Sequence, residues 1–253
     1  GDLSLSSSSA MFGSYGMQAL IDDTVAIQVE DTSPNNASEY HTRFYFDPNS
    51  LSIPLNNGFS IFHGGDYDTG WAFRLMLNNV EGAYKLQAQA YDDAGSTLAG
   101  QQVLITDAPQ SIELAYKASS LAGANDGYLE LWVNDILVDT IASIDNDTRW
   151  LDYINLGATG SIDTGTSGTV YFDQFESRQT THVGPVAYIA QLVAENSSSS
   201  QLVMDFPASF KLNKISLPFL QQGTTPTATA TVSSVNIPVS SAKRCASPAL
   251  VGS

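Results

Sequence analysis

Aromatic side chains beside polar groups are the part of this sequence best suited to binding chemistry. The segment Tyr67–Trp71 brings two rings together with a carboxylate and a hydroxyl. Rings pack on the apolar surface of a ligand while polar groups fix its orientation, a composition typical of sugar and small-molecule sites. We therefore expect Tyr67 and Trp71 to contact a ligand; the alternative is that these rings pack inside the protein. Three more rings are available to extend such a site: Tyr84, Tyr91 and Trp150.

Catalytic side chains lack the spacing that an enzyme needs. The three histidines, His41, His63 and His182, lie far apart in the sequence, and no Gly-x-Ser-x-Gly motif presents a serine nucleophile. Glycosidases need two carboxylates that act on one bond. Strand alternation would place Asp173 and Glu176 on opposite faces. We expect the protein not to be an enzyme.

The elements that must position these residues are predicted to be strands. The run from Gly127 to Arg178 alternates apolar and polar residues and is interrupted by Gly, Asn and Asp turn residues. Similar segments recur about every 8–14 residues, without helical periodicity, as in sandwiches and barrels. The sequence therefore predicts an all-β protein built as an antiparallel β-sandwich.

Trp132 stands out within this run. Leu129, Leu131 and Val133 share one face of their strand, so Trp132 points to the polar face. Exposing an indole there leaves a large apolar area in water. We therefore expect Trp132 to be a docking position for a sugar, for the tail of the chain or for a neighbouring molecule.

Several motifs carry a family likeness. The segments RFYFDPNSL (43–51) and DAPQSIELAYKA (107–118) precede the alternating run, and YFDQFESR (171–178) closes it. In this order they resemble the laminin-G-like, concanavalin-A-like jelly-roll domain of secreted bacterial proteins, over about residues 12–184. The resemblance implies a jelly-roll sandwich, a fold that serves sugar binding, adhesion, hydrolysis and scaffolding alike.

The same resemblance implies a structural calcium ion as a cofactor. Domains of this type often hold calcium between an acidic residue near the first strand and an aspartate on the last. Asp173 fits the second role, and Glu30 or Asp31 fits the first. The turn 145–147 is a further candidate, because calcium takes oxygen ligands from irregular backbone. The alternative at both places is an ordinary turn whose carboxylate accepts backbone hydrogen bonds.

The composition changes along the chain and predicts four segments. The tail alternates like a strand over Thr227–Val239 and could pair with the open sheet edge of a neighbour, as could Leu3–Ser9. The four segments are a Ser-rich N-terminal arm (1–11), the jelly-roll sandwich (12–184), a smaller C-terminal β region (185–222) and a Ser- and Thr-rich tail that is a possible donor strand (223–253).

Charge is unevenly distributed. The formal net charge is −16, and residues 1–176 carry 24 acidic side chains against five basic ones. Nucleic acid is excluded as a partner, because phosphate binding needs a basic footprint. The acidic body and the mildly basic tail could attract copies head to tail; the alternative is an acidic, solvated surface that keeps the protein soluble.

Cysteine usage and hydropathy bear on where the protein works. Cys245 is the single cysteine, so no intrachain disulfide can form, and no apolar run reaches the length of a membrane span. The chain begins with Gly, without a basic and apolar leader, so we expect a mature secreted protein, extracellular or at the cell surface. Three sequons are glycosylation candidates: Asn36, Asn146 and Asn196.

Two functions follow from these patterns. The first is a secreted structural protein that assembles with copies of itself into a filament, sheath or surface layer by adding strands between subunits. The alternative is a carbohydrate-binding or adhesion module with a structural calcium, whose partner is an extracellular polysaccharide.

Overall fold

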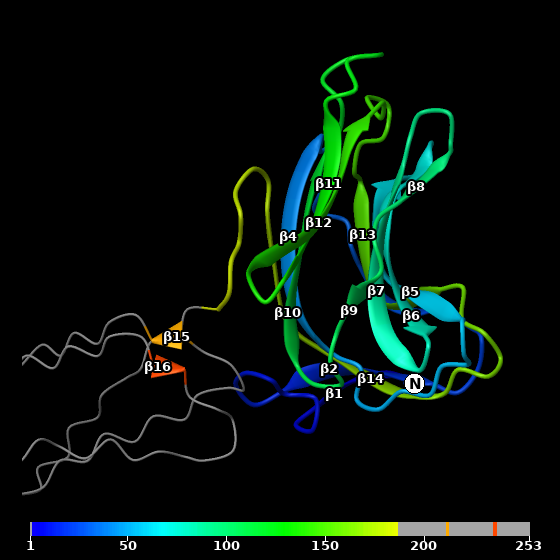
Figure 1. The fold of residues 1–253 in the computed structure, drawn as a ribbon, viewed down its shortest axis with the longest axis vertical. Coiled ribbons are helices and arrows are strands. Elements are labelled where there is room, and N and C mark those ends of the chain that lie inside the picture. The colour runs from blue at the N-terminus through cyan, green and yellow to red at the C-terminus, as the bar shows by residue number, and fades with distance from the viewer. Residues whose placement is uncertain (1, 187–210, 213–234, 237–253) are drawn as a thin grey trace, which may run out of the picture. The chain divides into compact units, whose positions relative to one another are not determined.

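The protein is all-β over the residues that the structure, a computed structural model, describes: 2–186, 211–212 and 235–236. Two antiparallel sheets face one another as a sandwich, and the described residues contain no helix (Figure 1). The first sheet runs in the order β1 (Leu3–Ser6), β2 (Gly16–Ile21), β14 (Gly168–Arg178), β4 (Glu39–Asp47), β10 (Gln110–Lys117), β11 (Gly127–Val133) and β12 (Ile136–Ile144). The second runs β3 (Ile27–Asp31), β13 (Tyr153–Gly160), β5 (Gly58–Asp66), β6 (Gly70–Val80), β7 (Ala83–Tyr91) and β8 (Thr97–Ala99), with β9 (Val103–Leu104) also paired to β7.

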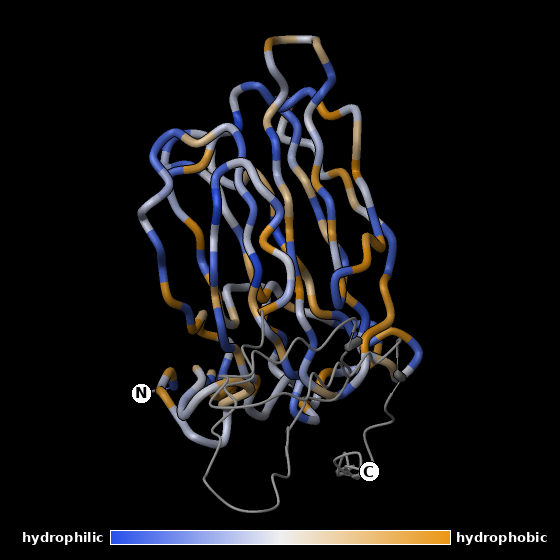
Figure 2. Tube along the Cα trace, turned by 90° about the vertical axis from the view of Figure 1, so that its left-hand side faces the viewer, coloured by the Kyte–Doolittle hydropathy of each residue, from blue (hydrophilic) through white to orange (hydrophobic). Residues whose placement is uncertain are grey.

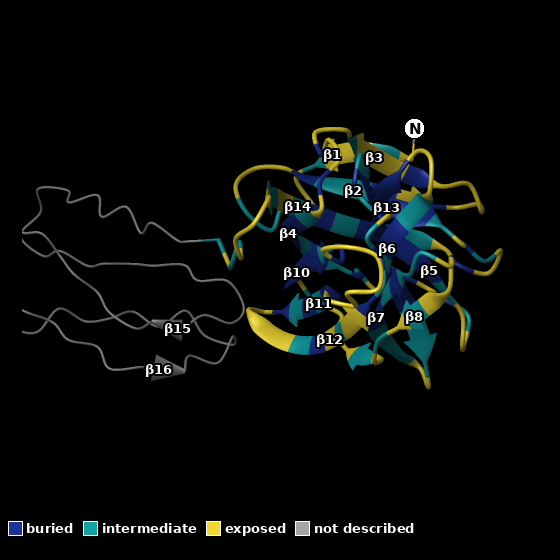
Figure 3. Cartoon of the chain, turned by 90° about the horizontal axis from the view of Figure 1, so that it is seen from above, coloured by how far each residue is buried: buried dark blue, intermediate teal, exposed yellow. Residues whose placement is uncertain are grey.

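The core lies between the sheets, as period-two patterning predicts. In β11, Leu129 and Leu131 are fully buried while Trp132 is half-buried. Apolar and polar residues alternate along the strands in Figure 2, and buried residues line the space between the layers in Figure 3. Rings contact one another across this space, and each fully buried ring stabilises the fold by roughly 1.5–3 kcal/mol. The largest are Tyr116, Phe44, Phe46, Phe59, Phe62, Phe73 and Phe172.

A β-bulge in β14 changes which face a residue occupies. In β14 the register shifts between Asp173 and Glu176, and Gln174 takes a positive φ of 51°. Asp173 lies opposite Tyr45 and Glu176 opposite Arg43. Because Tyr45 and Arg43 share a face, Asp173 and Glu176 share one too. The expectation from simple alternation, that these two carboxylates lie on opposite faces, is therefore wrong.

The N-terminal segment forms part of the sandwich. Leu3–Ser6 is strand β1, which pairs antiparallel with β2 from Leu3 opposite Ala19 to Ser6 opposite Gly16. Leu3 packs against the core, and Ser9 is buried. The expected arm (1–11) is thus an edge strand of its own sheet, held by backbone hydrogen bonds and one apolar anchor. Of the two candidate donor segments, Leu3–Ser9 therefore already has a partner strand, β2, over Leu3–Ser6.

The chain divides into two compact units, residues 1–186 and 187–253. In the second unit the structure describes only β15 (Lys211–Leu212), paired antiparallel with β16 (Val235–Asn236). Most of the predicted C-terminal β region and tail therefore lies outside the described residues, as do Asn196 and Cys245. In the part that is described, no helix is long and apolar enough to cross a bilayer.

Candidate functional site

A row of five aromatic rings crosses the second sheet. Tyr67, in the turn between β5 and β6, packs on Tyr153 of β13 with ring centroids 4.9 Å apart. The Tyr153 ring lies 6.0 Å from the His63 ring of β5, which lies 5.3 Å from Trp71 of β6. Trp71 in turn lies 6.0 Å from Tyr91 of β7. We call Tyr67, Tyr153, His63, Trp71 and Tyr91 the aromatic row.

The aromatic row lies on the face of the second sheet that points away from the first. Phe62 contacts Phe44 of the first sheet and Phe73 contacts Tyr116, so both rings fill the core. His63 follows Phe62 in the strand and therefore points the opposite way.

A bulge brings Trp71 to this outer face. The β5–β6 register shifts between Gly64 and Gly65, so that Gly65 lies opposite Trp71. A Cβ on Gly65 would come within 2.9 Å of the Trp71 Cα, so only glycine fits this close approach of the two strands.

Planar polar groups lie directly beside the rings. The Arg74 guanidinium is 5.3 Å from the Trp71 ring centroid and 6.0 Å from that of Tyr91, which are cation–π distances. Its Nε donates to Gln89 Oε1 at 2.7 Å, and Gln89 Nε2 donates to Gln87 Oε1 at 3.2 Å. Gln87 Nε2 donates to the Gly100 carbonyl at 3.0 Å. This relay of amides fixes the direction of the guanidinium.

His63 is held as a neutral ring. Asn155 Nδ2 lies 3.1 Å from His63 Nε2, and His63 Nδ1 lies 3.0 Å from Thr159 Oγ1. Because the amide nitrogen can only donate, Nε2 accepts and Nδ1 carries the proton. Burial, together with the charge of Arg74, lowers the pKa of His63 from 6.5 to about 4. Both nitrogens are engaged, so this histidine positions the row and is not a free base.

Acidic side chains lie at the Tyr67 end of the row. Glu30 Oε1 accepts from the Tyr67 hydroxyl at 3.4 Å, and Glu30 Oε2 lies 3.5 Å from Asn155 Nδ2. Burial, reinforced by Asp66 and Glu30, raises the pKa of the Tyr153 phenol, which therefore keeps its proton at neutral pH. Tyr67 is 65% exposed and the other three non-histidine rings are half-buried. The row thus offers accessible ring faces with donors beside them.

The predicted sugar-site residues fall into two groups. Tyr67, Trp71 and Tyr91 lie in the aromatic row. Tyr84 and Trp150 do not: their polar atoms donate to the backbone carbonyls of Leu51 and Asp147. Sequence reasoning missed His63, Arg74 and Tyr153, because the cross-strand register that brings them together cannot be predicted from the local alternation of apolar and polar residues.

Trp132 is covered by the chain's own continuation. Its ring lies 4.6 Å from the ring of His182, which belongs to residues 179–186, the segment after β14 that we call the strap (yellow beside the first sheet in Figure 1). Glu113, only 3% exposed, accepts from the backbone amides of Val183 and Gly184 at 2.7 and 2.9 Å. The docking position expected at Trp132 is therefore taken by the strap, within the same molecule.

The three residues expected to bind calcium line one cavity. Glu30, Asp31 and Asp173 border an apolar cavity of about 280 Å³ where the β1–β2 edge of the first sheet meets β3 of the second. Asp173 Oδ2 accepts from the amides of Met11 and Phe12, both at 2.8 Å. Asp31 accepts from the amide and hydroxyl of its neighbour Ser33, so each carboxylate already has protein donors. Calcium at these three residues stays a prediction.

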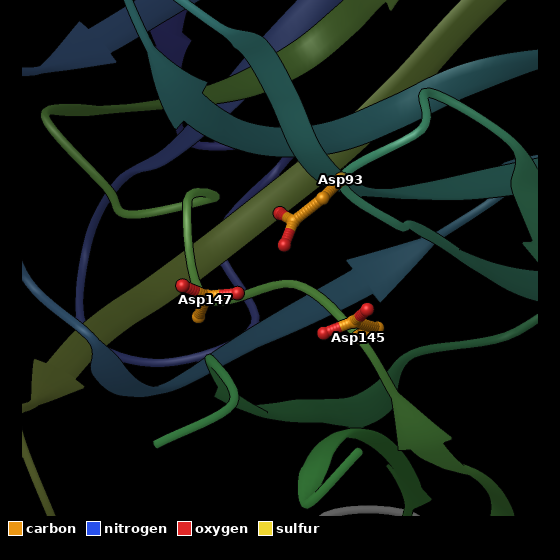
Figure 4. A group of neighbouring side chains, drawn as sticks. All are labelled: Asp93, Asp145 and Asp147. Atoms are coloured by element: carbon orange, nitrogen blue, oxygen red, sulfur yellow. The ribbon is translucent and has the colours of Figure 1, made fainter. Parts of the chain in front are cut away.

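The second candidate, in the turn 145–147, gains a third carboxylate. Asp93, after β7, joins Asp145 and Asp147, and one oxygen from each lies within 4.8 Å of the others, the one such group in the described residues (Figure 4). The side-chain hydrogen bond with Asp93 raises the pKa of Asp147. Burial would raise the pKa of Asp93, but the hydrogen bonds with Thr148 and Asp147 and the charge of Arg149 together outweigh burial and lower that pKa. The donor set is the all-oxygen kind that calcium takes.

Two of the three sequons lie in the described residues. Asn36 is exposed, in a turn with φ of 53°. Asn146 is fully buried: its Oδ1 accepts from the amide of Ser119 at 2.7 Å and its Nδ2 donates to the Tyr116 hydroxyl at 3.0 Å. The expectation that Asn146 carries a glycan is wrong for the folded protein, because its side chain satisfies buried polar groups.

Comparisons with known proteins give the fold but no family. No protein-family model and no curated protein sequence matches the chain. Among solved structures, the cellulose induced protein Cip1 is 19% identical, with a TM-score of 0.53 over 73% of this chain and 88% of that one. A structure described as HCR/D-Sa-GBL1/C is 10% identical, with a TM-score of 0.51 over 71% and 42%.

The receptor-binding domain of botulinum neurotoxin type G is 11% identical, with a TM-score of 0.48 over 71% of this chain. This chain spans 41% of that protein's length. The likeness to Cip1 and to HCR/D-Sa-GBL1/C is one of fold, and it agrees with the antiparallel β-sandwich described above.

Proposed function

We propose that this protein is a carbohydrate-binding module and that the aromatic row is its binding surface. The observation that carries the proposal is the unbroken series of rings from Tyr67 to Tyr91 with Arg74 beside it. Sugar rings present apolar C–H faces that pack on aromatic side chains, and their hydroxyls bond to planar polar groups. The separation of neighbouring rings, 4.9–6.0 Å, is comparable with the length of one sugar unit. The row therefore suits a chain of sugars better than a single one.

The chemistry of the row supports binding rather than turnover. His63 has both ring nitrogens engaged and stays neutral at neutral pH. On the first sheet, Asp173 holds two backbone amides, while Glu176 pairs with Arg43 at 2.7 Å and Arg178 at 2.8 Å. Although a bulge places these two carboxylates on one face, their partners are structural. The proposal includes three further parts: the protein binds extracellular polysaccharide, its sandwich is of the laminin-G-like type, and a calcium ion stabilises that sandwich.

Alanine at Trp71 tests the proposal, with alanine at Trp132 as its matched control. Each change removes one half-buried indole from an outer face, but only Trp71 belongs to the aromatic row. On a glycan array and by calorimetry, Trp71→Ala should weaken the best ligand at least about tenfold. Trp132→Ala should bind like the wild type. Equal effects of both variants, or no glycan bound by the folded wild type, would contradict the proposal.

Self-assembly is a second proposal that rests on charge. The acidic residues of 1–176 and the basic excess of the remaining chain suit head-to-tail contacts between copies. The tail segment Thr227–Val239 that would donate a strand lies outside the described residues. Electron microscopy of the full chain and of a version ending at residue 222 tests it: multimers that persist without the tail would exclude the tail as donor.

A further inference from the structure

Arg74 differs from the other arginines of the described chain in having no carboxylate and no backbone carbonyl as a partner. Arg43, 3% exposed, pairs with Glu176, and Arg178 pairs with the same carboxylate. Arg149 donates to the backbone carbonyls of Asp92 and Thr69. Arg74 makes no ion pair with any described carboxylate, and its one hydrogen bond goes to a neutral amide. In a chain with net charge −16, a cation without an acidic partner is notable.

The geometry leaves most of the guanidinium available to a ligand. A guanidinium has five N–H donors, and the bond from Nε to Gln89 Oε1 uses one. The four donors on the Nη atoms have no acceptor in the described residues, and the residue is partly exposed. Those donors form the fork that binds a carboxylate or a sulfate in two parallel hydrogen bonds.

The fork is held in place before any ligand arrives. The Trp71 and Tyr91 rings lie at cation–π distance from the guanidinium, and the relay from Gln89 through Gln87 to the Gly100 carbonyl fixes its rotation. Holding a charged group rigid reduces the entropy lost on binding. A guanidinium that only faces water would gain nothing from being held rigid in this way.

Among the charged side chains that contact the rings, the two ends of the aromatic row carry opposite charge. Arg74 lies at the Trp71–Tyr91 end, whereas Glu30 lies against Tyr67 at the other end. Lys85, on the same face of β7, is four residues from Gln89 and hence about 13 Å along the strand. A uniformly charged polyanion would be repelled by Glu30 and by the acidic body. A ligand with one anionic group at the Arg74 end and neutral sugars toward Tyr67 would match both ends.

We infer that the ligand of the aromatic row is an acidic oligosaccharide whose anionic group, a uronate carboxylate or a sulfate ester, binds the Arg74 fork. The inference rests on the proposed function and adds the chemical class of the ligand. Trp71 and Tyr91 pack on the charged sugar, and the Tyr153–Tyr67 end packs on the neutral units that follow it. Gln89 and Gln87 are positioning residues that act through Arg74.

The test uses matched pairs of oligosaccharides with the full-length protein. Oligosaccharides that carry one uronate are compared on an array with their carboxyl-reduced neutral twins, and mono-sulfated analogues form a third arm. The wild type should prefer an anionic member over its neutral twin by about tenfold, the low end for a hydrogen bond to a charged group. High salt should reduce the preference.

Variants assign the preference to Arg74. Arg74→Gln should abolish the difference in affinity between the anionic oligosaccharide and its neutral twin, and Arg74→Lys, which keeps the charge but not the fork, should retain part of that difference. Lys117→Gln, which removes one cation from the first sheet, should leave it intact. Circular dichroism verifies that each variant is folded.

Each outcome decides between the claims. Preference for the uronate or for the sulfate, lost in Arg74→Gln, supports the inference and identifies the anion. Equal binding of anionic and neutral twins overturns the inference and leaves the proposed function standing. A preference that survives Arg74→Gln also overturns it. Binding of no saccharide at all rejects the proposed function itself.

Discussion

At the scale of single residues, His63 shows how a buried polar group supports an outer surface. The ring is 5% exposed and its hydrogen bonds to Asn155 and Thr159 suit only the neutral form. The Thr159 hydroxyl in turn donates to Ser60 Oγ at 2.8 Å, so a buried polar network lies beneath the aromatic row. A buried polar network fixes one arrangement of its side chains when every hydrogen bond is made. Adding a charge to such a network lowers the stability of the fold.

We predict that His63 makes the fold less stable in acid. An unfolded histidine binds its proton near pH 6.5, whereas the folded pKa is about 4. Between these values the unfolded state holds more protons, so stability is full above pH 6.5 and falls as the pH drops toward 4. The free energy of unfolding should fall by roughly 3 kcal/mol over this interval, because each pH unit contributes about 1.4 kcal/mol.

Urea unfolding at a series of pH values measures this loss, with His63→Gln as the reference. Carboxylates titrate in both proteins, so the difference between the two curves isolates His63. The difference should shrink as the pH falls, because the variant has no proton to take up. Parallel curves from pH 7 to pH 4 would show that His63 does not remain neutral in the fold.

At the scale of elements, the strap closes the outer face of the first sheet. A row of residues crosses that face in register: Glu176 of β14, Arg43 of β4, Glu113 of β10 and Trp132 of β11. Arg43 Nε donates to the Gly184 carbonyl at 3.2 Å, and both ring nitrogens of His182 face carboxylates, Glu113 at 2.9 Å and Asp135 at 3.0 Å. The strap thus supplies hydrogen-bond partners to two buried charged side chains, Arg43 and Glu113.

We predict that Glu113→Ala detaches the strap. The change removes the acceptor of the Val183 and Gly184 amides and one partner of His182. Bonds to a charged group contribute about 1.5–3 kcal/mol each, so exchange of those two amides should accelerate by on the order of tenfold or more. Trp132 should also become more accessible to acrylamide.

Glu130→Ala is the control for the strap. Glu130 lies on the same face of β11 and touches Trp132 Nε1 at 3.4 Å, but none of the strap amides. Amide exchange at Val183 and Gly184 should stay as slow as in the wild type. If Glu113→Ala leaves exchange equally slow, the carboxylate does not hold the strap.

Elements also show how far the sequence could predict the structure. Period-two alternation identifies strands such as β11, where Leu129 and Leu131 are buried as expected, and predicts the sandwich. It fails at the bulges, where one extra residue moves Glu176 and Trp71 to faces that alternation does not give them. It also treats the Ser-rich start as an arm, because the pairing of Leu3 with Ala19 depends on a partner strand and not on local composition.

The candidate site was predictable only in part, for a related reason. Tyr67 and Trp71 are close in sequence, so one loop reveals them. Tyr153, His63 and Arg74 come from three strands, and sheet register alone brings them together. The sequon makes Asn146 a glycosylation candidate although its side chain is fully buried, because a sequon says nothing about burial.

At the scale of the whole molecule, the two outer faces of the sandwich differ. The first sheet carries a charged row whose members pair with one another and with the strap. The second carries the aromatic row, where Arg74 has no acidic partner among the described residues and Tyr67 is 65% exposed. One face is therefore closed within residues 1–186, and the other keeps its binding groups available. The ligand surface we propose follows from this difference.

The indole signals of the intact protein test this account most directly. The chain has three tryptophans, and Trp71, Trp132 and Trp150 each give one indole N–H resonance. On titration with the acidic oligosaccharide that binds best on the array, we expect the Trp71 signal to shift while the other two stay in place. A shift confined to Trp132 or Trp150, or no shift at Trp71 at saturating ligand, would contradict the aromatic row as the binding surface.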